Sequence, residues 1–183
     1  MVVTISTKQG KIAGKNVKVK NELTEKGCFS FQGIPYAKCN RFQKPVAYGP
    51  WDGVFDGTGK TPKQVQYHEI LENFHKIDGI TVFPENSRET FEETPTADGE
   101  LHLAVYTPEN FEKSALKPVM VWVSVKTLFQ IFLNTKEQRL SYNHEKRFFI
   151  DNEIHGGTWI LGGCYEYNGA MLSAYKDVVV GQA

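Results

Sequence analysis

The residues best suited by type to do chemistry form a glycine loop, His155-Gly156-Gly157-Thr158-Trp159. Glycine has no Cβ, so the backbone N–H groups of such a turn can approach a ligand closely. Backbone N–H groups aimed at one point can stabilise an oxyanion that develops during a reaction. The chemistry to look for is therefore the stabilisation of a negatively charged oxygen by backbone donors.

A strand must hold this loop, and the candidate is Pro118-Val119-Met120-Val121-Trp122-Val123, an apolar run that predicts a buried central strand. Joined directly, the two pieces would form a strand that runs into a tight glycine turn. Instead, about thirty residues, 124–154, separate them, although such connections normally have only a few residues. We interpret 124–154 as an insertion and hypothesise a retained intron or a similar gene-model error.

Three further motifs belong with this strand and loop. They are Phe29-Ser30-Phe31-Gln32-Gly33-Ile34-Pro35-Tyr36-Ala37, Pro50-Trp51-Asp52-Gly53-Val54 and Leu101-His102-Leu103-Ala104-Val105-Tyr106-Thr107-Pro108. Together with the strand and the glycine loop, they resemble the carboxylesterase type B family, the cholinesterase-like branch of the α/β-hydrolases. The first motif is the most specific, because many positions agree in succession.

The resemblance implies an α/β fold, namely the N-terminal part of an α/β-hydrolase. An antiparallel hairpin over residues 2–20 is followed by the first strands of a mixed central sheet, which is incomplete. Ala170 to Tyr175 is expected to form a short helical turn, and Asp177 to Val180 begins the next parallel strand. We expect one truncated domain over 1–183, with 124–154 as a non-family insertion and with exposed strand edges.

The resemblance also implies a carboxylic-ester hydrolase that acts on small-molecule carboxylic esters. The N–H groups of Gly157 and Thr158 match the family's oxyanion-hole donors. Thr158 replaces the usual third glycine, and its β-branched side chain restricts the turn. His155 matches a non-catalytic histidine of the family, and His102 is expected to face solvent or a neighbour. No catalytic residue is assigned.

A serine esterase of this fold needs a nucleophile on a Gly-X-Ser-X-Gly turn, with a histidine base and an acid. No Gly-X-Ser-X-Gly sequence occurs in these 183 residues. We therefore expect this polypeptide to be inactive by itself. The alternative is a non-catalytic cholinesterase-like binding or adhesion module, although such proteins keep a full-length domain, a secretory leader and a membrane anchor.

Composition argues against several other classes of function. The 21 basic residues balance the 21 acidic ones, whereas a nucleic-acid binder needs a basic surplus on one face. No apolar run is long enough to cross a bilayer, so no membrane partner is expected. Gly57-Thr58-Gly59-Lys60-Thr61 lacks the earlier glycine of a phosphate loop, because Val54 stands there. His68 and His75 have no ligand set around them, so no metal or cofactor is expected.

The expected location is cytoplasmic. Met1 leads directly into strand-like sequence without a basic-then-apolar leader, although a truncated N-terminus would permit secretion. Cys28, Cys39 and Cys164 are odd in number, which fits reduced thiols.

Overall fold

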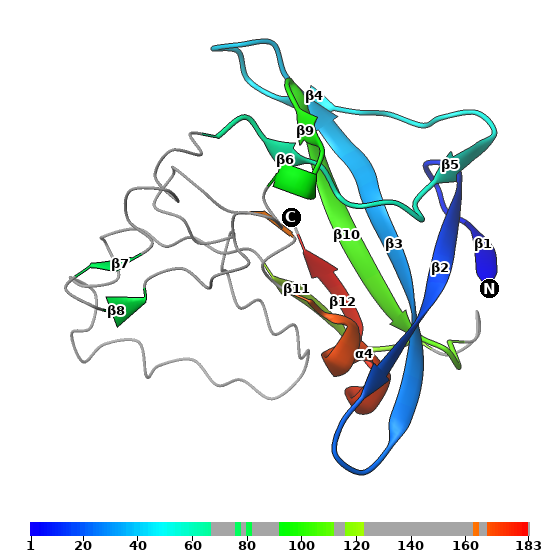
Figure 1. The fold of residues 1–183 in the computed structure, drawn as a ribbon. Helices are drawn as coiled ribbons and strands as arrows, with labels where there is room; N and C mark the ends of the chain where they lie inside the picture. The colour runs from blue at the N-terminus through cyan, green and yellow to red at the C-terminus, as the bar shows by residue number, and fades with distance from the viewer. Residues whose placement is uncertain are drawn as a thin grey trace, which may run out of the picture.

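A computed structural model describes residues 1–66, 76–77, 80–81, 92–111, 116–122, 163–164 and 168–182. Its main feature is an eight-stranded mixed sheet whose central path runs in the order β1-β2-β3-β10-β12-β11 (Figure 1). The strands on this path are β1 (Val2–Ser6), β2 (Lys11–Lys20), β3 (Glu25–Lys38), β10 (Glu100–Pro108), β12 (Val179–Gln182) and β11 (Val119–Trp122). The mixed sheet confirms the fold class expected from the sequence.

Short strands extend this framework. β4 (Val46–Ala47) pairs with β3, and β5 (Val54–Asp56) pairs with β2. Two separate pairs are β6 (Lys63–Gln64) with β9 (Thr96–Ala97), and β7 (Lys76–Ile77) with β8 (Ile80–Thr81). The described residues contain no helix long and apolar enough to cross a membrane.

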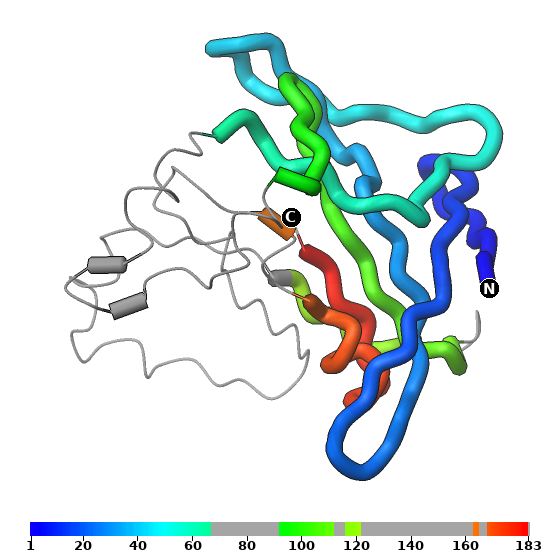
Figure 2. Tube along the Cα trace, viewed as in Figure 1, coloured from blue at the N-terminus to red at the C-terminus, as the bar shows by residue number. Residues whose placement is uncertain are grey.

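The N-terminal strands form the predicted antiparallel hairpin. β1 pairs with β2 from Val2↔Lys15 to Ser6↔Lys11, and the chain turns at Gly10. β2 and β3 then form a longer antiparallel pair that extends beyond the rest of the sheet (Figure 2). The hydroxyl group of Tyr175 donates to the carbonyl of Thr24, 2.5 Å away. This contact ties the end of the hairpin to the helix Ala170–Lys176, which contains Tyr175.

The last three strands of the path carry the parallel part of the sheet. β12 is antiparallel to β10 and parallel to β11, so it lies between two strands that both precede it in the chain. Helix α4 (Ala170–Lys176) directly precedes β12 and lies across one face of the sheet (Figure 1). The predicted helical turn and the predicted parallel strand are both confirmed.

The sheet buries apolar side chains on both faces. Cys28, Ala104, Tyr106 and Val180 pack with Ala170 of α4 on one face. Ile12, Phe29 and Phe31 form the second cluster, together with partly buried residues that include Trp51 and Phe55. The Trp51 indole N–H donates to the carbonyl of Lys11 at 3.0 Å, which holds the ring over this second cluster.

Candidate functional site: the carboxyl edge of the parallel strands

The sequence prediction joins the oxyanion loop to the end of the strand 118–123, so the end of β11 is the place to look for the site. β11 and β12 pair in parallel from Val119↔Val179 to Trp122↔Gln182, so their carboxyl ends lie side by side. In open α/β sheets, ligands bind outside the carboxyl ends of the strands. β10 runs in the opposite direction and therefore begins near this edge, with Glu100 and His102. These strand ends define the carboxyl edge.

The opposite ends of the same two strands are fixed by polar contacts. The backbone N–H of Val179 donates to the carbonyl of Pro118 at 2.9 Å. The Lys117 ammonium lies 2.7 Å from a carboxylate oxygen of Asp177, which ends α4 in the left-handed region with φ 56°. Asp tolerates this conformation better than most residues. These contacts set the register in which β11 and β12 reach the carboxyl edge.

The sequence-predicted site residues Gly157 and Thr158 lie outside the described residues, as do His155 and the segment 124–154. The structure does describe the strand that precedes them. The predicted strand 118–123 corresponds to β11, Val119–Trp122, which is confirmed. The structure therefore tests the strand, whereas the oxyanion loop and the roles of Gly157 and Thr158 stay predictions.

Cys164 lies against the end of β12. Its thiol is 3.6 Å from the carbonyl oxygen of Gln182, to which it can donate. Burial raises the pKa of the Cys164 thiol to about 11. Because the thiolate is the nucleophilic form, this cysteine is not activated for attack. The same reasoning applies to Cys28, whose pKa burial also raises to about 11.

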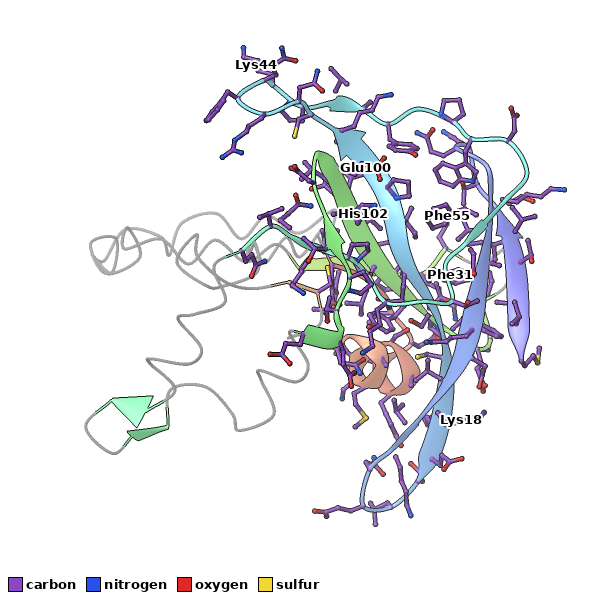
Figure 3. The ribbon with its side chains drawn as sticks, turned by 45° about the horizontal axis from the view of Figure 1, so that its top comes forward. Lys18, Phe31, Lys44, Phe55, Glu100 and His102 are labelled. Atoms are coloured by element: carbon purple, nitrogen blue, oxygen red, sulfur yellow. The ribbon has the colours of Figure 1, made fainter. Side chains whose placement is uncertain are left out.

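His102 is the one histidine among the described residues. From the sequence, its side chain was expected to face either solvent or a neighbour, and it faces a neighbour. Its Nε2 lies 3.4 Å from a carboxylate oxygen of Glu100, and its side chain is only 8% exposed. Figure 3 labels both residues along β10. A buried imidazole paired with a carboxylate has a fixed orientation.

Burial shifts the pKa values of three further groups among the described residues. Burial lowers the pKa of Lys63, whose ammonium donates to the carbonyl of Thr94. Burial raises the pKa values of Tyr36 and Tyr106. In the described part of the chain, no group of three or more His, Cys, Asp or Glu side chains could hold a metal ion.

An apolar cavity of about 320 Å³ lies on the other face of the sheet, beside the second core cluster. Ile12, Phe31, Trp51 and Val105 contribute to its wall. Neither His102 nor Gln182 lines it. The cavity therefore belongs to the packing around the N-terminal strands and is separate from the carboxyl edge.

Comparison with known proteins places this sheet in a family. A family model described as "Carboxylesterase family" matches residues 2–134. The chain is 32% identical over 181 residues to pyrethroid hydrolase Ces2e of Rattus norvegicus, covering 96% of this chain and 24% of that protein. It is 30% identical to liver carboxylesterase 1F of Rattus norvegicus, covering 96% of this chain and 25% of that protein. It is 28% identical to cocaine esterase of Homo sapiens, with the same two coverages.

The chain thus spans about a quarter of the length of these relatives. The family match covers well over half of the chain and includes β1 to β11. The family match and the similarity to these relatives agree with the motifs found in the sequence. The chain therefore belongs to the carboxylesterase family.

Proposed function

We propose that this chain forms one section of a carboxylic-ester hydrolase whose substrates are small-molecule carboxylic esters. The observation that carries the proposal is the family match over residues 2–134. The relatives' names support the same class of reaction, because they include a pyrethroid hydrolase, a carboxylesterase and a cocaine esterase. Within such an enzyme, this section contributes the strands that lead to the substrate-binding edge.

In this proposal, the N–H groups of Gly157 and Thr158 donate to the oxyanion of the tetrahedral intermediate. What supports it is the place where β11 ends. Trp122 lies at the carboxyl edge beside Gln182, where an oxyanion loop would have to begin. The missing Cβ of Gly157 permits close approach, and Thr158 keeps the N–H that the reaction needs.

The chain alone is proposed to be inactive. Its 183 residues contain no Gly-X-Ser-X-Gly sequence, so they supply no nucleophile of the type this fold uses. In a serine protease that lacks its triad, the oxyanion hole and binding retain a rate only about 10³- to 10⁴-fold above that in water. Such a residual rate is small beside that of a complete enzyme.

The test is hydrolysis of p-nitrophenyl acetate by the purified 183-residue chain. We expect no release of p-nitrophenol beyond that caused by an equal concentration of Gly157→Pro protein. Turnover by the unmodified chain that Gly157→Pro abolishes would show that the chain is active by itself. A carboxylesterase relative, assayed in the same buffer, serves as the positive control.

The segment 124–154 is proposed to be an insertion into one truncated family domain. The family match ends at residue 134, so it covers 124–134 and leaves 135–154 outside the match. Sequencing of transcripts across the junction after Val123 tests the retained-intron hypothesis, which predicts that most messages lack the segment.

The cytoplasmic location also stays a prediction. Fractionation of cells that express the tagged chain is the measurement that tests it.

A further inference from the structure

Two buried polar atoms at the carboxyl edge have no hydrogen-bond partner among the described residues. They are Nδ1 of His102 and Oε1 of Gln182. The His102 side chain is 8% exposed, and Gln182 is 5% exposed. Leaving one such atom unsatisfied costs about 1–3 kcal/mol, so most buried polar atoms in native proteins have a partner. Two of them at one edge point to a shared partner.

The register places the two side chains next to each other. Ala104 of β10 pairs with Gln182 of β12. His102 lies two residues before Ala104, so it is on the same face of the sheet and diagonal to Gln182. Diagonal neighbours in an antiparallel pair are about 7–8 Å apart at most, within reach of long side chains. This register brings His102 and Gln182 close enough for one small molecule to bridge their side chains.

The Glu100 carboxylate lies on the Nε2 side of the His102 ring. The two atoms are 3.4 Å apart, so the negative charge of the carboxylate favours the hydrogen of the neutral ring on Nε2. Nδ1 is then an acceptor, and Oε1 of Gln182 is an acceptor as well. Two acceptors cannot bond to each other, but a molecule with two donor hydrogens satisfies both.

We propose that one buried water molecule binds between Nδ1 of His102 and Oε1 of Gln182 and donates one hydrogen bond to each. The water joins β10 to β12 at the carboxyl edge and holds both side chains in place. A buried water of this kind typically makes two to four hydrogen bonds to polar groups that otherwise lack partners. The site thus suits a small neutral donor.

A catalytic interpretation of the same residues is less favourable. A carboxylate, an imidazole and a water in series are the arrangement that activates a water for attack. This water, however, gives both hydrogens to buried acceptors, and His102 is more than nine-tenths buried. Its role is therefore to position β10 and β12, which form the sheet beside the proposed oxyanion loop.

The test is NMR spectroscopy of the full 183-residue chain labelled with ¹⁵N-histidine. We expect His102 in the Nε2–H tautomer, with the Nδ1 resonance shifted as for an acceptor of a hydrogen bond. We also expect cross-relaxation between ring or Gln182 protons and a long-lived water. An Nδ1–H tautomer, or the absence of a long-lived water signal, would overturn the proposal.

A matched pair of variants separates the water site from general effects on the fold. Gln182→Met keeps the length of the side chain but removes the acceptor, so the long-lived water signal should be lost while the Nε2–H tautomer persists. Gln9→Met changes an exposed glutamine in the turn after β1 and should leave the signal unchanged. If the Gln182→Met variant does not fold, the tautomer and water signals of the unmodified chain still test the proposed water site.

Discussion

At the scale of single residues, some glycines are required because another side chain occupies the space of their Cβ. A Cβ on Gly14 of β2 would lie 2.4 Å from the ring of Phe31 and 2.8 Å from the carbonyl oxygen of Ser30. A Cβ on Gly27 of β3 would similarly meet the carboxylate of Glu109. That carboxylate accepts hydrogen bonds from Asn16 and Lys18, which lowers its pKa.

Gly14→Ala is predicted to destabilise the fold by about 1–3 kcal/mol, the usual cost of overpacking a core. Phe31 is fully buried, so its ring cannot move aside without disturbing the second core cluster. The measurement is urea unfolding followed by circular dichroism. Gly59→Ala is the matched control, since nothing lies within 4 Å of its Cβ position. Equal stability of the two variants would contradict this packing.

The buried thiol of Cys28 leads to a prediction of how the stability of the chain depends on pH. Burial raises the pKa of Cys28 from 9.0 to about 11, so the folded chain keeps the thiol neutral where the unfolded chain ionises it. The stabilising contribution is complete below pH 9 and is lost between pH 9 and about pH 11, at about 1.4 kcal/mol per pH unit. Urea unfolding of the unmodified chain and of Cys28→Ala across this pH range isolates the effect.

The variant should show a shallower loss of stability above pH 9 than the unmodified chain. Cys39→Ala removes a thiol that lies outside both buried core clusters and serves as the control for the loss of a cysteine. A slope that is the same in all three proteins would show that Cys28 does not titrate abnormally.

At the scale of elements, β3 bends where it passes β10. The register between the two strands shifts between Leu101 and His102, and again between Leu103 and Val105. Gly33 lies at the second shift with φ 66°. Its backbone N–H donates to the hydroxyl of Thr61 at 2.8 Å, and this hydroxyl donates to the Gln32 side chain at 2.7 Å. Thr61 thereby connects the bend to the segment before β6.

Thr61→Val should destabilise the chain by about 1–3 kcal/mol, because the buried N–H of Gly33 and the side-chain oxygen Oε1 of Gln32 both lose their partner. Thermal unfolding followed by circular dichroism measures the effect. Thr4→Val on exposed β1 makes the same chemical change at the surface and should be close to neutral. Similar midpoints for the two variants would mean that the Thr61 hydroxyl does not support the bend.

Local patterns explain which elements could be predicted from the sequence. The apolar run 118–123, the alternating strand 101–108 and the short helix after Asn168 each depend on neighbouring residues, and all three are present. The position of β12 between β10 and β11 depends on pairing across the chain. Residue patterns alone do not encode such non-local pairing, and only the family resemblance implied a mixed sheet.

The same limit applies to the site. The glycine loop was recognisable because His155-Gly156-Gly157-Thr158 is a contiguous motif. The approach of His102 to Gln182 depends on the register Ala104↔Gln182, which joins residues far apart in the sequence. His102 was therefore predicted only to face solvent or a neighbour, and Gln182 carried no signal at all.

At the scale of the whole molecule, the described sheet ends in a strand with exposed apolar side chains. β11 pairs with β12 on one side, and Val119 and Val121 are 45% and 40% exposed. Apolar strand edges of this kind favour association with other chains. The relatives are about four times as long as the segment they share with this chain. We expect the exposed edge at β11 to make the isolated chain prone to association.

According to the proposed function, this chain supplies a working section of an ester hydrolase. The most direct measurement is p-nitrophenyl acetate turnover by a chimera in which this chain, without 124–154, replaces the matching quarter of the rat pyrethroid hydrolase. We expect the chimera to hydrolyse the ester and the Gly157→Pro substitution to abolish this turnover. A folded chimera that binds the ester but does not hydrolyse it would contradict the claim and favour the non-catalytic binding module.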